Sequence, residues 1–179
     1  MRAVIVYESM FGATRQVAEA ISEGLGGPDV ARVVPVQEAT PEVLATADLL
    51  VVGGPTHVHG MARPRSRRAA VEMTERPGKR LKMEPGAAGP GLREWFDQMS
   101  ATYLPAAAAF DTKVGGPWLF TGRASHRIAR LLKKHGARPI ARPRSFLIAH
   151  DEPAPGQLDA ARTWGQALRA AVGAHQAVA

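Results

Sequence analysis

The sequence predicts a doubly wound α/β fold, with a five-stranded parallel sheet in the order 2-1-3-4-5 and helices on both faces. Short apolar runs alternate along the chain with segments of helical periodicity, a pattern typical of parallel strands joined by crossover helices. The runs are nearly continuous, as expected for strands buried on both faces. Proline cannot donate a ladder hydrogen bond, and it occurs within or just before the second and fifth runs, at Pro35, Pro139 and Pro143. We therefore expect strands two and five at the sheet edges.

The first half of the chain contains three of these strands, expected at 3–7, 32–36 and 48–53. Two helical segments connect them. The first helix has an apolar face of Val17, Ala18, Ile21 and Leu25 and stops at Gly26-Gly27-Pro28, and the second is a short piece at 41–46.

The second half of the chain repeats the pattern. Strands are expected at 106–110 and 145–149, with a loop at 115–122. Three helices are predicted from apolar residues spaced to lie on one face. Their buried faces are Leu92, Trp95, Phe96 and Met99; Ile128, Leu131, Leu132 and His135; and Leu158, Ala161, Trp164, Leu168 and Val172.

Residues 61–90 interrupt this alternation, and we expect a surface insertion there in a chain that otherwise forms a single domain over 1–179. Residues 63–82 carry a net charge of +6, out of +7 for the whole chain, and residues 85–91 are rich in Gly and Pro. No aromatic residue is interleaved with the basic ones for base stacking. We therefore expect no nucleic-acid partner.

Composition narrows the possible chemistry. The chain of 179 residues has no cysteine, which excludes disulfides, CxxC redox pairs and thiolate metal centres, so any redox chemistry needs a bound cofactor. No apolar run reaches the ~20 residues of a membrane-spanning helix, and the N-terminal run lacks a signal-peptide cleavage site. We expect a cytoplasmic protein without a membrane span.

The most informative segment is Ser9-Met10-Phe11-Gly12-Ala13-Thr14, between the first strand and the first helix. A helix N-terminus leaves backbone N–H groups unpaired and attracts anions such as phosphate. Ser9 and Thr14 add hydroxyl donors, and Gly12 allows an anion to approach the backbone. The alternative is a plain turn with a Ser or Thr cap. The dinucleotide and P-loop glycine patterns are absent, which argues against NAD and ATP.

Here the sequence resembles the flavodoxin family over essentially the whole chain apart from residues 61–90, and it looks closest to flavodoxin-domain proteins of actinobacteria. The family's phosphate loop is [TS]-x-T-G-x-T; Ser9, Gly12 and Thr14 match it in register, and Phe11 replaces the central Thr. The run from Asp48 to His57 is similar to the third strand and flavin-ring loop. The resemblance implies noncovalent FMN. It would be held by Ser9, Met10, Phe11, Gly12, Ala13 and Thr14 at the phosphate, by Pro55, Thr56, His57, Val58, His59 and Gly60 beside the ring, and by Thr112, Gly115, Gly116 and Trp118 on the other side.

The resemblance implies electron transfer between redox partners. Because the chain is basic, the partner should be a redox protein with an acidic face, such as a ferredoxin or a reductase. The alternatives are an FMN-dependent oxidoreductase of the quinone reductase or protoporphyrinogen oxidase type, acting on a small quinone-like substrate, and a binding module without flavin. His57 and His59 have a spacing that can ligate a metal. No third ligand is near in sequence, so we expect no metal site, and no catalytic residue is assigned.

Overall fold

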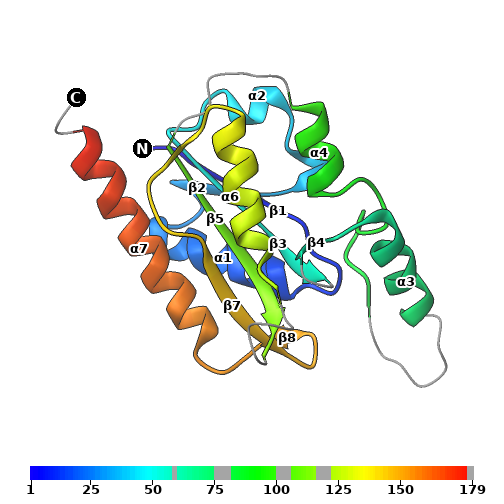
Figure 1. The fold of residues 1–179 in the computed structure, drawn as a ribbon. Helices are drawn as coiled ribbons and strands as arrows, with labels where there is room; N and C mark the ends of the chain where they lie inside the picture. The colour runs from blue at the N-terminus through cyan, green and yellow to red at the C-terminus, as the bar shows by residue number, and fades with distance from the viewer. Residues whose placement is uncertain (58–59, 75–81, 100–105, 116–121, 177–179) are drawn as a thin grey trace.

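The structure is a computed structural model that describes residues 1–57, 60–74, 82–99, 106–115 and 122–176 (Figure 1). Its main strands are β1 (Ala3–Tyr7), β2 (Ala31–Pro35), β3 (Leu49–His57), β5 (Ala106–Val114) and β7 (Arg144–Ala149). They are parallel and lie in the order β2-β1-β3-β5-β7, which confirms the predicted fold and strand order.

The predicted number of strands was too low. In the described residues the sheet also contains β4 (Gly60–Met61), β6 (Arg138–Pro139) and β8 (Glu152–Pro153). Each has two residues, too short for a hydrophobic period to reveal it. Pro35 does end the edge strand β2, whereas β7 is not the outermost strand, because β8 pairs antiparallel with its last two residues.

Helices cover both faces of the sheet (Figure 1). On one face α1 (Ala13–Leu25) and α7 (Gln157–Gln176) pack together, and their apolar residues share a core with Ile5, Val51 and Phe110. On the other face α4 (Leu92–Gln98) and α6 (Ala124–Lys134) share a core with Val4 and Val52. The short helices η1 (Val36–Glu38) and α2 (Pro41–Leu44) follow β2, and α3 (Pro64–Thr74) stands beside β4. No helix in the described ranges is long and apolar enough to cross a membrane.

Two strands extend beyond their predicted ends. β3 continues to His57 and β5 to Val114, because the β3–β5 ladder runs on through Gly53–Phe110, Gly54–Asp111 and Pro55–Thr112. Glycine is required for packing at this end of β3, since a Cβ at Gly53 would clash with the ring of Phe110. The polar residues at both strand ends are therefore held on a rigid sheet.

Candidate functional site

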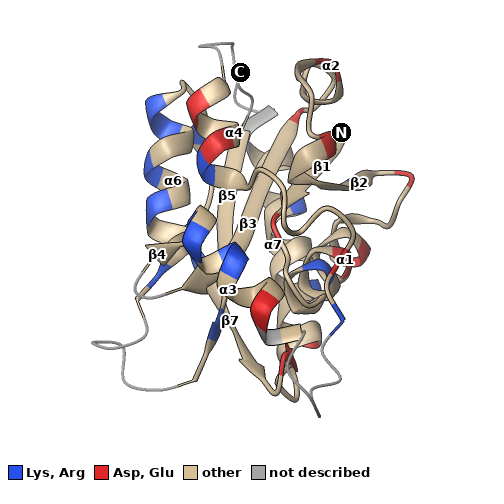
Figure 2. Cartoon of the chain, turned by 90° about the vertical axis from the view of Figure 1, so that its right-hand side faces the viewer, with Lys and Arg blue, Asp and Glu red and all other residues tan. Residues whose placement is uncertain are grey.

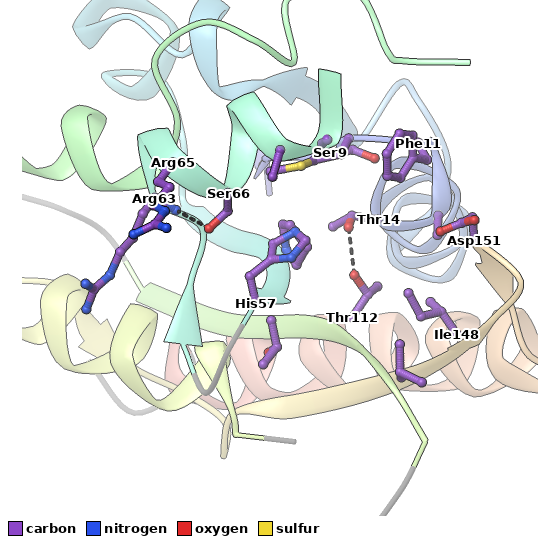
Figure 3. Close-up of a pocket in the computed structure, with 17 residues that line it drawn as sticks. Ser9, Phe11, Thr14, His57, Arg63, Arg65, Ser66, Thr112, Ile148 and Asp151 are labelled. Atoms are coloured by element: carbon purple, nitrogen blue, oxygen red, sulfur yellow. Dashed lines mark hydrogen bonds between the residues drawn. The ribbon is translucent and has the colours of Figure 1, made fainter. Parts of the chain in front are cut away.

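A cavity of about 780 Å³ opens at the carboxyl ends of β1, β3 and β5 (Figure 3). The connection after β1 leads to α1 on one face of the sheet, whereas the connection after β3 leads to α3 and α4 on the other side. The point between these two strands is called a topological switch point. Ligands of doubly wound folds bind at such a switch point. The cavity is lined by Ser9, Met10, Phe11, Ala13, Thr14, Pro55, Thr56, His57, Arg63, Arg65, Ser66, Ala69, Ala70, Thr112, Val114, Ile148 and Asp151.

The loop between β1 and α1 borders the cavity. Gly12 is the N-cap of α1 and has a φ of 98°, a left-handed conformation that favours glycine. Its N–H donates to Ser9 Oγ at 3.1 Å, which leaves the Ser9 hydroxyl proton available to another acceptor. The next N–H groups of α1 have no intrahelical acceptor, because the first helical bond runs from Gln16 N–H to the Gly12 carbonyl.

A buried hydroxyl pair connects this loop to β5. Thr14 Oγ1 and Thr112 Oγ1 are 2.7 Å apart, and one of them donates to the other (Figure 3). The accepting hydroxyl keeps its own proton, which it can direct into the cavity. Two of the predicted site residues, 98 positions apart in the chain, are thus brought into direct contact.

Glu84 closes the outer side of the loop, a contact that sequence reasoning missed. Its N–H donates to the Met10 carbonyl at 2.9 Å, and its carboxylate accepts two bonds from Arg15 Nε at 3.1 Å. A Cβ at Gly12 would lie 3.1 Å from Glu84 Oε1. A side chain at position 12 would therefore have to displace the Glu84 carboxylate slightly, in addition to straining the left-handed backbone.

The ends of β3 and β5 position His57 and the N-terminus of α6. Thr56 Oγ1 accepts the Ala124 N–H at 2.9 Å, and Asp111 Oδ2 accepts the Ser125 N–H at 2.7 Å. Asp111, one residue past the predicted end of the strand at 106–110, is fully buried in β5 and caps α6. His57 Nε2 is buried without a hydrogen-bond partner among the described residues, and burial lowers the pKa of the imidazole. The neutral His57 therefore offers a polar nitrogen to a ligand.

Part of the segment predicted as a surface insertion forms a wall of the cavity, through Arg63, Arg65 and Ser66 at the start of α3 and through Ala69 and Ala70. The sequence pattern identified its basic charge but could not show where α3 packs.

Arg67, in the same segment, is buried. Its guanidinium lies 2.8 Å from Glu94 Oε1 and 3.5 Å from Glu8 Oε1. Glu8 in turn accepts the Leu92 N–H at 3.0 Å, and burial raises the pKa of its carboxyl despite the arginine. This network joins the end of β1, directly before the loop, to α3 and α4. The charged Glu8 directly after the apolar run 3–7 was the signal in the sequence.

Most of the predicted site residues converge at the cavity. Ser9, Met10, Phe11, Ala13, Thr14, Pro55, Thr56, His57 and Thr112 line it. Gly60 instead lies in β4, paired with His57, and Gly115 follows the end of β5. The predicted residues Val58, His59, Gly116 and Trp118 lie outside the described residues. Within the described ranges, no group of three His, Asp or Glu residues could hold a metal ion.

Comparisons with known proteins place this geometry in a family. The family model described as flavodoxin matches residues 5–164, so the chain belongs to the flavodoxin family. Flavodoxins bind FMN, which confirms the predicted family and cofactor. None of the curated proteins compared with the chain gives a significant match.

Solved structures have a similar fold at low identity. A flavodoxin from the domain Archaea has a TM-score of 0.64 at 20% identity, with 97% of this chain and 99% of that chain covered. Oxidised flavodoxin 1 from Bacillus cereus has a TM-score of 0.65 at 15% identity, with 98% and 99% covered. A WrbA-like flavodoxin from Agrobacterium tumefaciens has a TM-score of 0.59 at 18% identity, with 97% and 98% covered.

Proposed function

Because the chain belongs to the flavodoxin family, we propose that it holds FMN noncovalently in this cavity and transfers electrons between redox partners. The observation that carries the proposal is the Ser9–Thr14 loop. It combines a left-handed Gly12 at the start of α1, two hydroxyls and unpaired helix N–H groups at the edge of the cavity. These donors fit a phosphate, which helix N-termini bind readily.

The residues present fit the rest of the cofactor as well. Pro55, Thr56, His57 and Gly60 would border the ring on the β3 side, and Thr112 and Gly115 on the β5 side. The resemblance adds Val58, His59, Gly116 and Trp118 to these two groups. His57 Nε2 supports the assignment, since a buried nitrogen without a partner is available to a polar ligand atom. When bound, FMN would supply one- and two-electron redox chemistry.

Removal of the phosphate donors tests the proposal. Gly12→Asp should abolish FMN binding, because it adds a negative charge and a side chain that would contact Glu84. Thr14→Ala should weaken binding about tenfold, the effect of one charge-assisted hydrogen bond of roughly 1.5 kcal/mol. Fluorescence titration of the apoprotein with FMN measures both changes. Ser22→Ala, which removes a buried hydroxyl bonded to the Ala31 carbonyl away from the loop, is the control. Unchanged FMN affinity in Gly12→Asp would remove the phosphate assignment.

The wall formed by α3 favours a second candidate function, an oxidoreductase acting on a small quinone-like substrate. A substrate in the cavity would contact Ala69, which lines it and is otherwise exposed. Ala69→Phe should then reduce quinone turnover by a larger factor than it reduces FMN affinity or electron transfer to a protein partner. If Ala69→Phe leaves quinone turnover at the wild-type rate, this second function loses its support.

A further inference from the structure

Basic residues gather on helices α3 and α6 (Figure 2). Helix α6 carries four exposed cations and no acidic residue: Arg127, Arg130, Lys133 and Lys134. The start of α3 adds the exposed Arg63, Arg65 and Arg68. In Figure 2 the basic segments of α3 and α6 lie in the left and centre of the view, next to both basic and acidic segments of α4, and further acidic segments mark α1 and α2 on the right.

Arg93 of α4 joins the two basic helices. Its guanidinium donates to the Ala62 carbonyl at 2.8 Å and to the Met61 carbonyl at 3.0 Å, which holds it next to Arg63. Burial and the nearby charges of Arg127 and Arg63 lower the pKa of Arg93. Arg63, in the turn between β4 and α3, Arg93 of α4 and Arg127 of α6 therefore lie close enough to repel one another, near the place where α6 packs against β4.

Among the described residues, no carboxylate forms an ion pair with Arg63, Arg65, Arg93, Arg127 or Arg130. Glu94 and Glu8 attract Arg93 less than Arg127 and Arg63 repel it. Elsewhere in the same ranges, Arg15, Arg67 and Arg162 each pair with two acids. A cluster of like charges without ion-pair partners repels itself and is stabilised by an external anionic surface.

The cluster also reaches the proposed cofactor site, because Arg63 and Arg65 line the cavity (Figure 3). A partner that covers these arginines would lie at the cavity mouth. A single-stranded nucleic acid fits this surface less well, since it needs exposed aromatic side chains for stacking. In the described parts of α3, α4 and α6 the aromatic residues are Phe96, which is buried, and Trp95, which is partly buried and donates to the Ala39 carbonyl.

We propose that this basic surface, formed by Arg63, Arg65, Arg93, Arg127, Arg130 and Lys134, is the docking site for a redox protein with an acidic face. The inference rests on the proposed electron-transfer function and specifies where the partner docks. Because most of these side chains are exposed, they act mainly on the rate of encounter, through attraction that salt screens.

Charge reversal on α6 tests the inference in the FMN-loaded protein. The test variant is Arg127→Glu/Arg130→Glu. The control is Arg32→Glu/Arg138→Glu, which changes the net charge equally at exposed positions near the amino ends of β2 and β5. Electron transfer from each reduced protein is followed by stopped flow with an acidic ferredoxin and with a basic cytochrome c. Salt is varied from about 10 mM to about 1 M, which shortens the Debye length from about 30 Å to about 3 Å.

We expect the α6 variant to reduce the ferredoxin about tenfold more slowly than wild type at low salt and at the same rate at high salt, since electrostatic steering raises association rates by at least that factor. It should reduce the basic cytochrome c faster, and the control variant should change both low-salt rates by a smaller factor than the α6 variant does, because its charges lie farther from the docked partner. Rates that change in the same direction with both acceptors would point to a structural effect and overturn the inference.

Equal low-salt rates for the two variants would place docking elsewhere while the electron-transfer function stands. No transfer from the wild-type protein to either acceptor would instead refute the proposed function, and the inference with it. A third outcome is salt-dependent binding of a single-stranded oligonucleotide that the α6 variant alone loses, without any change in electron transfer. That result would assign the surface to nucleic acid and overturn the proposal.

Discussion

Arg67→Met should destabilise the protein strongly and in a pH-dependent manner, because Arg67 is the buried cation that compensates Glu8. The Arg67 and Glu8 side chains are 5% and 3% exposed, so water cannot replace the missing charge. Removal of one partner from a buried ion pair typically costs about 3–5 kcal/mol. At about 2–4 °C per kcal/mol for a domain of this size, the melting temperature should fall by roughly 6–20 °C.

The pH dependence follows from Glu8. Burial raises the pKa of its carboxyl above the ordinary value, and the charge of Arg67 opposes that rise. Without Arg67 the folded-state pKa of Glu8 should rise further, so the folded protein binds the proton more tightly than the unfolded chain. Stability is then retained below the unfolded pKa and lost as the pH rises through the folded pKa. The free energy of unfolding of Arg67→Met should therefore fall further below that of the wild type at pH 8 than at pH 5.

Urea unfolding of both proteins at the two pH values measures the effect. Arg68→Met, a substitution of the exposed neighbour on α3, is the control and should change the free energy of unfolding by less than about 0.5 kcal/mol. Glu8→Gln in the Arg67→Met background should recover part of the loss and remove the pH dependence, since no charge remains to be buried. A deficit below about 1 kcal/mol at pH 8, or an equal deficit at both pH values, would refute this account of the network.

Three further predictions concern other residues of the site. Glu84→Gln should tighten FMN binding severalfold at low salt in fluorescence titration, because it removes a negative charge beside Gly12. The control is Glu19→Gln, which removes the other, exposed carboxylate that pairs with Arg15. His57→Gln should stabilise the protein relative to wild type at pH 5 but not at pH 8 in urea unfolding. The lowered pKa of His57 means that the unfolded chain binds the proton more tightly than the folded protein. The free energy of unfolding of the wild type therefore decreases as the pH is lowered. Asp111→Ala should cost about 1–2 kcal/mol in thermal unfolding through loss of the α6 cap, and a stability equal to wild type would show that the cap is dispensable.

Part of the candidate site could be predicted from local sequence. The Ser9–Thr14 loop follows an apolar run and precedes a helical period, so its position at a carboxyl strand end follows from the fold class. His57 and Thr112 were predicted beside the cofactor, and both line the cavity. Their secondary structure was predicted wrongly, because the ladder between β3 and β5 extends past the apolar residues that mark a strand.

Sequence by itself determined the architecture of this protein: five principal strands, their order, the helices on both faces and the phosphate-type loop. Each of these features follows from the spacing of apolar residues, the alternation of strands with helices, or the residue types in a turn. All three are patterns within short stretches of sequence. Only the tertiary structure decided that α3 forms a wall of the cavity and that Arg67 is buried between Glu8 and Glu94. It also decided that Arg63, Arg93 and Arg127 lie close enough for their charges to interact. These contacts join residues that are tens of positions apart, and no hydrophobic period encodes the distance between them. A count of charges in sequence therefore identifies a basic segment, whereas packing determines which of its arginines stabilise the core and which face a partner.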